Sequence, residues 1–201
     1  MQFFLTVLAV LVLLCASELA WRKHWFSGEL GRKFVHITVG CIVAFSPYWL
    51  TWDDIRLMSV AFLAVVILSK MFHIFQAVHS VQRPTHGEIF FAISVGLLTF
   101  ITQNKGIYAA SILQMALADG FAAIFGTKWG RGNTYRIFDH TKSIVGTAVF
   151  IAIAMVILLV NGATIEQITL GAILAAALEN VAPLGLDNLL VPLSTCLILL
   201  S

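Results

Sequence analysis

The sequence predicts an all-α integral membrane protein with several membrane-spanning helices. Hydrophobic residues make up 60% of the 201 residues and charged residues only 11%, and the mean hydropathy is +0.95. A soluble domain of this size would carry about a quarter charged residues. The apolar runs are each about 20 residues long, which is enough for a helix to cross a bilayer. Since no stretch between them is long enough for a soluble domain, we expect residues 1–201 to form one integral membrane domain.

Seven or eight spans follow from the apolar runs. The expected helices are 2–20, 34–51, 55–72, 88–103, 107–126, 143–161, 166–180 and 187–201. The last two runs are short and are separated by residues 180–186, so they are expected either as full spans or as broken half-helices. The short connections between the spans must then carry the functional surface.

The basic residues fix the expected orientation. One set of alternate connections carries Arg22, Lys23, Arg32, Lys33, Lys70, Arg83, Lys128, Arg131, Arg136 and Lys142. The opposite side holds only Arg56 and Lys105. Because basic loops are retained in the cytoplasm, the sequence predicts the larger set there and the N-terminus outside. No basic residue precedes the first apolar run, so we do not expect it to be a signal peptide.

Asp119 is the first candidate functional residue, because it lies inside an otherwise apolar run. An ionised carboxylate at such a position is costly unless it faces a partner or water. Ala122 and Gly126 follow on or near the same helical face, which leaves room for a ligand. The alternative is tight helix packing through the small residues, with Asp119 paired to a lysine or arginine.

A glycine-rich basic loop is expected at 127–141, directly after this helix. Glycines such as Gly130 let backbone N–H groups close on phosphate oxygens, and Lys128 adds positive charge. Lys142 and Ser143 open the next helix, whose N-terminus favours anions. The spacing is not that of a P-loop. A solvated basic loop that contacts anionic lipid headgroups is the alternative.

Two further polar clusters begin spans on the same predicted face. Arg32, Lys33 and His36 are three or four residues apart and can form one patch at the start of the second span. Arg83 and Glu88 mark the start of the fourth. Each cluster also has a structural explanation, since basic residues at helix ends extend toward the interface and an acidic residue is favourable at a helix N-terminus.

The last cluster flanks a predicted break near the C-terminus. Glu179 and Asn180 precede Pro183 and Gly185, while Asp187 and Asn188 follow them. An unwound segment persists at membrane depth only where it is buried in protein or lines a cavity. One polar cluster is easily structural, but five that converge on one membrane face indicate a site.

These motifs resemble those of the CTP-dependent polyprenol kinases, which include dolichol kinase, phytol kinase and the yeast-type diacylglycerol kinase and are distantly similar to phosphatidate cytidylyltransferase. The resemblance covers about residues 30–195 and is most specific over 119–146. The matching pieces are Arg32-Lys33-x-x-His36, Arg83-x-x-x-Gly87-Glu88, Asp119-x-x-Ala122-x-x-x-Gly126, Lys142-Ser143-x-x-Gly146-Thr147, Glu179, and Asp187-Asn188-x-x-Val191-Pro192.

The resemblance implies transfer of the γ-phosphate of CTP to the hydroxyl of a membrane lipid alcohol, with Mg²⁺ as cofactor. Such chemistry needs positioning, metal ions and positive charge around the phosphate. The implied metal ligands are Asp119 and Asp187, and the implied catalytic residues are Asp119, Lys142, Asp187, Glu179 and His36. The choice of base among Asp187, Glu179 and His36 stays open.

The remaining implied roles concern the two substrates. For the nucleotide they fall on Arg32, Lys33, Gly126, Lys128, Gly130, Lys142 and Ser143. For the lipid alcohol they fall on Glu88, Ala122 and Asn188, and the small-residue face beside Asp119 is expected to admit the tail. No nucleic-acid partner is expected, and the sequence determines neither the alcohol nor the oligomeric state.

Two other functions stay open at this stage. Cytidylyl transfer onto phosphatidic acid shares the Asp-x-x-Ala-x-x-x-Gly and Lys-Ser-x-x-Gly pieces, but the chain lacks the length and the C-terminal signature expected of that enzyme. A small transporter would place its polar residues near the membrane midplane between repeated halves. Here the polar residues gather at one predicted face and no repeat is visible.

Overall fold

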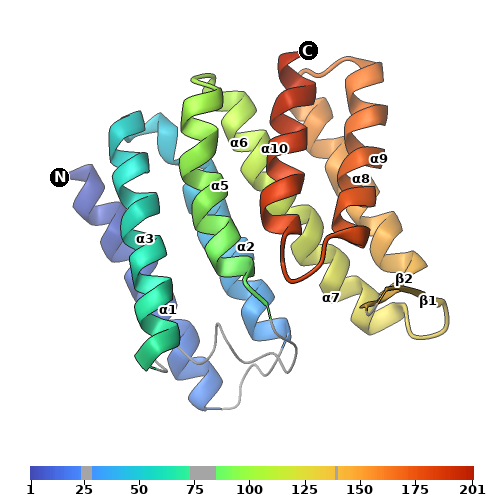
Figure 1. The fold of residues 1–201 in the computed structure, drawn as a ribbon, viewed down its shortest axis with the longest axis horizontal. Helices are drawn as coiled ribbons and strands as arrows, with labels where there is room; N and C mark the ends of the chain where they lie inside the picture. The colour runs from blue at the N-terminus through green and yellow to red at the C-terminus, as the bar shows by residue number, and fades with distance from the viewer. Residues whose placement is uncertain (24–28, 73–84, 139) are drawn as a thin grey trace.

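The computed structural model describes residues 1–23, 29–72, 85–138 and 140–201, and the described chain is mainly helical (Figure 1). The helices are α1 (Gln2–Arg22), α2 (Glu29–Phe45), α3 (Trp52–Phe72), α5 (Gly87–Ile101), α6 (Lys105–Leu113), α7 (Asp119–Trp129), α8 (Ile144–Val160), α9 (Ile165–Val181) and α10 (Asp187–Leu200). Two short elements are the 3-10 helix η1 (Ser46–Tyr48) and the π-helical segment η2 (Gln114–Ala118). The strands β1 (Thr134–Ile137) and β2 (His140–Ser143) form an antiparallel hairpin.

Each expected apolar run is helical in the structure. The elements α6, η2 and α7 join into one helix of 25 residues, Lys105–Trp129. This helix, α1 and α3 are long and apolar enough to cross a membrane, and α5, α8 and α10 are shorter apolar helices. The prediction of a helical membrane protein agrees with this, while the number of spans stays a prediction.

The segment after α7 corrects the prediction of an irregular loop. α7 continues to Trp129, and the hairpin then pairs Tyr135 with Lys142 and Thr134 with Ser143. Thr134, Tyr135 and Ile137 in the first run and Thr141 in the second favour extended backbone. A hydrogen bond of 3.0 Å from the Ile144 amide to the Asn133 carbonyl closes the open end of the hairpin. The fold is therefore helical with one small hairpin rather than strictly all-α.

The helices are arranged in two layers. In the view of Figure 1, α3, α5, α10 and α9 form the front layer, and α1, α2, the helix 105–129 and α8 form the rear layer. On one half the layers join closely, where α8 packs on α9 and α10 packs on α6. On the other half, α1 packs on α2 and α3 packs on α5. Among the described residues, the backbone of the α1–α2 pair comes close to the backbone of the α3–α5 pair at few points or none.

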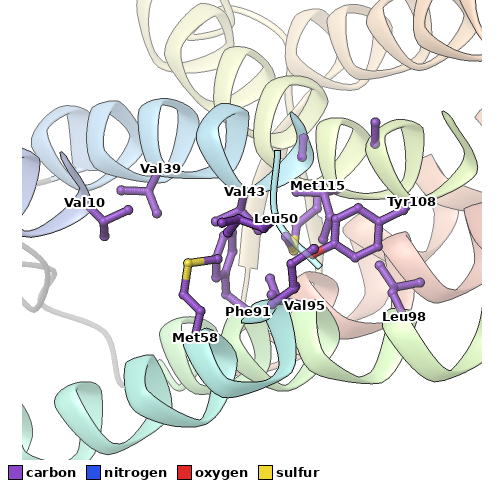
Figure 2. Close-up of a cluster of buried hydrophobic side chains, with 14 of the residues drawn as sticks. Val10, Val39, Val43, Leu50, Met58, Phe91, Val95, Leu98, Tyr108 and Met115 are labelled. Atoms are coloured by element: carbon purple, nitrogen blue, oxygen red, sulfur yellow. The ribbon is translucent and has the colours of Figure 1, made fainter. Parts of the chain in front are cut away.

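Side chains rather than backbone contacts connect the two helix pairs on this looser half. Val39 and Val43 of α2 lie opposite Met58 of α3 and Phe91 of α5, within one buried apolar cluster (Figure 2). Val10 of α1 extends the cluster at its edge (Figure 2). The looser half is consequently held by apolar burial, and it has room for grooves between the layers.

The break predicted near the C-terminus is present. α9 ends at Val181, α10 begins at Asp187, and the turn between them contains Gly185 at φ +87°. A Cβ added at Gly185 would lie 2.6 Å from the backbone of Gly87, so glycine is required at this contact. The amide of His86 donates to the Leu184 carbonyl at 2.9 Å. The turn is thereby fixed against the start of α5.

The connections predicted to share one face do lie at one end of the molecule. The hairpin, the start of α2, the start of α5 and the turn between α9 and α10 lie toward the lower end of Figure 1. Arg56 contacts Thr99 near the end of α5, with Nε 3.0 Å from Oγ1, and Lys105 begins α6 at the same opposite end. Which end faces the cytoplasm stays a prediction. Arg83 and Asp139 lie outside the described residues.

Candidate active site

A partly open polar cavity, about 1360 Å³ when the open space at its mouth is counted, lies where the predicted site residues meet. Its walls come from α2, α7, the hairpin, the first turn of α8, the end of α9 and the start of α10. The charged lining residues are Arg32, Lys33, Arg131, Lys142, Asp119, Glu179 and Asp187. The prediction that Glu179 and Asp187 reach the same cavity as Asp119 is confirmed.

Asp119 lies in an ion pair at the wall of this cavity. It begins α7 directly after the π-helical segment η2, a kind of irregularity that is frequent at functional sites. Lys33 Nζ donates to Asp119 Oδ2 at 2.5 Å, and the two side chains are only 4% and 8% exposed. His36 Nε2 lies 3.9 Å from the same oxygen and 3.1 Å from the Met115 carbonyl. Asp119 is therefore paired with a lysine, as the packing alternative predicts, and it also borders a cavity, so its role in ligand binding stays a prediction.

Lys142 forms a second ion pair from the hairpin. Its Nζ contacts Glu179 Oε1 and donates to the Glu179 carbonyl at 3.2 Å. Burial lowers the pKa of Lys142, but the charge of Glu179 and its hydrogen bond more than offset this, so the pKa of Lys142 is raised above its ordinary value. Lys142 is therefore protonated at neutral pH and suits an anionic ligand.

A hydroxyl network anchors the strand pair that carries Lys142. Tyr135, which lies opposite Lys142 in the hairpin register, donates from its hydroxyl to Asn180 Oδ1 at 2.8 Å. The same hydroxyl contacts Thr147 Oγ1. Asn180 Nδ2 in turn donates to the Ala176 carbonyl at 2.8 Å within α9. The network connects the hairpin to α8 and α9, and so fixes the position of Lys142.

The small residues of α7 and α8 set the spacing of the cavity floor. A Cβ added at Gly126 would lie 3.3 Å from Gly146 Cα, and one at Gly146 would lie 3.0 Å from the Ala122 carbonyl. Ser143 caps α8, because its Oγ accepts from the Gly146 amide at 3.0 Å. Ala122 and Gly126 line the polar cavity and pack toward α8. The expectation that this strip admits an apolar tail stays a prediction, and the residues around the strip are mostly polar.

Asp187 and Asn188 reach the cavity from the first turn of α10. Asp187 interacts electrostatically with Asp119, Lys33 and Glu179 across the cavity. Asn188 is 3% exposed, and its Nδ2 donates to the Gly185 carbonyl at 3.1 Å. The Gly185 turn thus orients the residues that follow it.

Two residues predicted to bind nucleotide lie outside the cavity lining. Lys128 is exposed on the last turn of α7, with Nζ 5.1 Å from the centre of the Trp129 ring. Gly130 is buried and packs against the side chain of Ser143. The reason is that α7 continues through this segment, which turns Lys128 outward instead of leaving it in a flexible loop.

His36 and Glu88 line a neighbouring apolar groove instead of the polar cavity. Glu88 is paired with Lys70 of α3, with Oε2 3.4 Å from Nζ. The groove shares Arg32 and Asn188 with the polar cavity, so the two spaces meet at these residues. Both predicted residues are thus near the site, on its apolar side.

Several hydroxyl groups of the cavity were not predicted. Thr85, Thr127, Thr134 and Thr141 all line it. A single threonine in a connection carries no signal that separates it from other polar residues, and the two in the hairpin became neighbours only through strand pairing. Arg131, which was predicted only as part of the basic loop, is the basic residue of that connection that reaches the cavity.

The carboxylates fit a magnesium ion that is shared with phosphate. No group of three or more His, Cys, Asp or Glu side chains within the described ranges is placed to hold an ion by itself. Mg²⁺ is usually bound through one or two carboxylates together with substrate phosphates and water. Asp119 and Asp187 both line the polar cavity, which also carries four basic side chains, so the residues present are compatible with such an ion.

The fold and the cavity define a helical membrane protein with a charged site suited to phosphate compounds. The chain is 35% identical over 207 residues to the phytol kinase of Synechocystis sp., in a match that covers 96% of this chain and 87% of that protein. The chain therefore belongs to the polyprenol kinase family that includes phytol kinase. No protein-family model matches the sequence, and no solved structure matches it.

Proposed function

We propose that the protein is a lipid-alcohol kinase that transfers the γ-phosphate of CTP to the hydroxyl of a phytol-like membrane alcohol. The observation that carries the proposal is the meeting of Lys33, Asp119, Lys142, Glu179 and Asp187 in one cavity of a chain from the phytol kinase family. CTP as the donor comes from the resemblance of the motifs, and the alcohol comes from the name of the relative.

The basic residues of the cavity would hold the triphosphate. Arg32, Lys33, Arg131 and Lys142 line it from three different segments, so positive charge surrounds the bound phosphates. The N-terminal turn of α8 adds backbone N–H groups, which favour anions. Phosphoryl transfer depends on such positioning and charge neutralisation more than on covalent help from the protein.

Asp119 is the residue that we assign to Mg²⁺. Bound with phosphate oxygens, the ion would neutralise charge on the transferring group. Lys33 now pairs with Asp119, and both residues line the same cavity. Lys33 would therefore exchange its carboxylate partner for a phosphate oxygen when the nucleotide and its ion bind.

Asp187 is the residue that we assign as proton acceptor. Asp119 is paired with Lys33 and Glu179 with Lys142, whereas Asp187 has no ion-pair partner within 4 Å among the described residues. The alcohol oxygen would attack the γ-phosphorus as its proton passes to Asp187, and the bond to the β-phosphate oxygen would break to release CDP. Binding of a second ion is the competing role for Asp187.

A transfer assay tests the proposal. The purified protein in lipid nanodiscs is given γ-labelled CTP, ATP, GTP or UTP with phytol, geranylgeraniol, a long polyprenol or diacylglycerol. We expect label in a lipid monophosphate, CTP as the best donor and CDP as the other product. Release of pyrophosphate would indicate cytidylyl transfer instead. Absence of label from every lipid with every nucleotide would contradict the proposal.

A further inference from the structure

An apolar groove adjoins the polar cavity on the looser half of the bundle. It lies between α1, α2, α3 and α5 and has a volume of about 650 Å³ when the open space at its mouth is counted. Its apolar lining includes Leu14, Val35, Val39, Phe62, Val65 and Phe91. A second apolar space of about 600 Å³ shares five of these residues and extends the groove toward Val43, Met58 and Val95. The two spaces are therefore adjacent, and they lie in line away from the cavity.

The mouth of the groove carries acceptors suited to a hydroxyl group. Arg32 and Asn188 line both the groove and the polar cavity, so a ligand in the groove ends where the phosphates would lie. Asn188 Oδ1 is buried and has no hydrogen-bond partner in the part of the chain that the structure describes. Both carboxylate oxygens of Glu88 are also buried, with the side chain only 9% exposed, and the carboxylate is ion-paired with Lys70 but accepts no hydrogen bond from the described residues. Buried acceptors of this kind ordinarily have a donor.

The helix packing explains how an apolar chain reaches the groove. The groove lies between the pairs α1–α2 and α3–α5, whose backbones make few or no close contacts with each other in the described ranges. Within these ranges the seam between α1 and α3 is therefore closed mainly by side chains. A lipid tail in the bilayer needs only side-chain rearrangement at this seam to enter, whereas α8 against α9 and α10 against α6 close the other half.

The dimensions favour a single chain of moderate length. Along α2, the path from Arg32 to Val43 spans eleven residues, or about 16 Å at the helical rise. An extended hydrocarbon chain of on the order of a dozen carbons covers that distance, given bonds of about 1.5 Å between tetrahedral carbons. Because packed helix layers ordinarily lie about 8–10 Å apart, a second tail would require the two helix pairs to separate further than a single chain requires.

We propose that this groove binds the tail of a single-chain isoprenoid alcohol, with its hydroxyl at Asn188 and Glu88, and that it selects such alcohols over two-tailed diacylglycerol. The inference rests on the proposed function for the identity of the ligand as an alcohol. The groove nevertheless makes a prediction about binding that needs no nucleotide and no phosphate transfer.

The first test maps binding directly on the wild-type protein. A twenty-carbon isoprenoid alcohol with a photoreactive diazirine near the end of its tail is cross-linked in nanodiscs without nucleotide, and the labelled peptides are identified by mass spectrometry. We expect saturable labelling on α2, α3 and α5 around Val39, Phe62 and Val95, which an excess of phytol removes. Labelling confined to the outer faces of α8 and α9, or labelling that phytol does not displace, would contradict the proposal that the groove binds the tail.

The second test changes chain-length preference. Val95→Phe narrows the deep end of the groove, so we expect at least a tenfold higher KM for the twenty-carbon alcohol, little change for a ten-carbon alcohol and an unchanged KM for the nucleotide. Val60→Phe, at a position 65% exposed on α3, is the matched control and should change none of them. Equal KM values for both alcohols in Val95→Phe and wild type would overturn the proposal.

The two tests separate this inference from the proposed function. Cross-linking in the groove without any phosphate transfer would retain the tail site and reject the kinase. Transfer with cross-links elsewhere would retain the kinase and reject the tail site, and so would transfer to diacylglycerol as fast as to phytol. Should Val95→Phe fail to fold, cross-linking on the wild-type chain still decides the question.

Discussion

At the scale of single residues, the site consists of buried charged side chains that form ion pairs and still border the cavity. Lys33 with Asp119 and Lys142 with Glu179 satisfy each other inside the bundle, because a buried charge without a partner is costly. Both pairs border the cavity, so a ligand can replace one partner. Such exchangeable pairing reconciles the structural and the functional interpretations of Asp119.

Asp119→Asn is expected to lower turnover at least a hundredfold, which corresponds to roughly 2.7 kcal/mol at the transition state. The substitution keeps size but removes the charge that would hold Mg²⁺. The loss of turnover is measured from initial rates at several Mg²⁺ concentrations. Asp53→Asn is the control, because Asp53 is exposed at the opposite end of the bundle. Near-normal turnover in a folded Asp119→Asn protein would show that Asp119 contributes to helix packing and not to metal binding.

Lys142→Ala is expected to raise the KM for the nucleotide at least tenfold, since it removes a charge held in the cavity wall. Lys142→Arg should restore only part of the affinity for the nucleotide, because a larger planar guanidinium group replaces a compact ammonium group. Lys128→Ala and Lys105→Ala are the controls, and both should resemble wild type, since neither side chain lines the cavity. The same KM in Lys142→Ala as in the two controls would exclude Lys142 from nucleotide binding.

At the scale of secondary-structure elements, the hairpin and the α9–α10 turn place the charges. The hairpin carries Lys142 and is tied to α9 through Tyr135 and Asn180. The turn carries Gly185 against Gly87 and directs Asp187 into the cavity. Two short connections thus determine the geometry of a site whose remaining walls are rigid helices.

Tyr135→Phe is expected to lower stability by about 1 kcal/mol through its lost hydrogen bonds and to raise the nucleotide KM through misplacement of Lys142. Asn180→Ala should do the same, and the double variant should be less affected than the sum of the single effects. Thermal melts and nucleotide KM values are compared for the two single variants and the double variant. Tyr48→Phe is the control, because Tyr48 is exposed. Fully additive effects on KM would mean that the two residues do not act as one anchor.

Gly185→Ala is expected to reduce turnover at least tenfold, because its Cβ would meet the Gly87 backbone and shift the turn before Asp187. Gly162→Ala is a matched control, since Gly162 also has positive φ, at +79°, but nothing lies within 4 Å of an added Cβ. Both variants carry backbone strain of about 1 kcal/mol or more. Equal turnover in the two variants would show that the close contact at Gly185 does not govern the site.

At the scale of the whole molecule, the two-layer bundle combines a closed half and a loose half. The closed half, with α8 on α9 and α10 on α6, supports the polar cavity. The loose half, between α1–α2 and α3–α5, contains the apolar groove. A site that joins a water-soluble nucleotide to a lipid alcohol needs both environments side by side.

The orientation of this bundle is testable with Gly132→Cys in a background without the three native cysteines. Gly132 is exposed at the cavity end, and an added Cβ would meet nothing within 4 Å. Because the basic connections share this end, we expect protection from an impermeant thiol reagent in intact cells and labelling after permeabilisation. Ala163→Cys at the opposite end should label directly. The reverse pattern would contradict a cytoplasmic site.

The sequence by itself determined the helical membrane class and most of the charged residues of the cavity. Apolar runs about 20 residues long set the helices locally, and a charge such as Asp119 inside such a run is visible without coordinates. The break around Gly185 was visible for the same reason, because Pro183 and Gly185 lie close together between two polar pairs at the ends of apolar runs. These features depend on neighbours in the chain.

Tertiary structure alone decided which of those residues face one another. Lys128 lies outside the cavity lining because α7 extends to Trp129, whereas Arg131 reaches the cavity from the turn before the hairpin and two threonines reach it from the paired strands. The apolar groove follows from how two helix pairs pack. The sequence around apolar residues such as Val39 and Phe91 does not show whether they line a groove or lie in the core. Contacts between distant segments depend on packing of the whole bundle, which local sequence patterns do not encode.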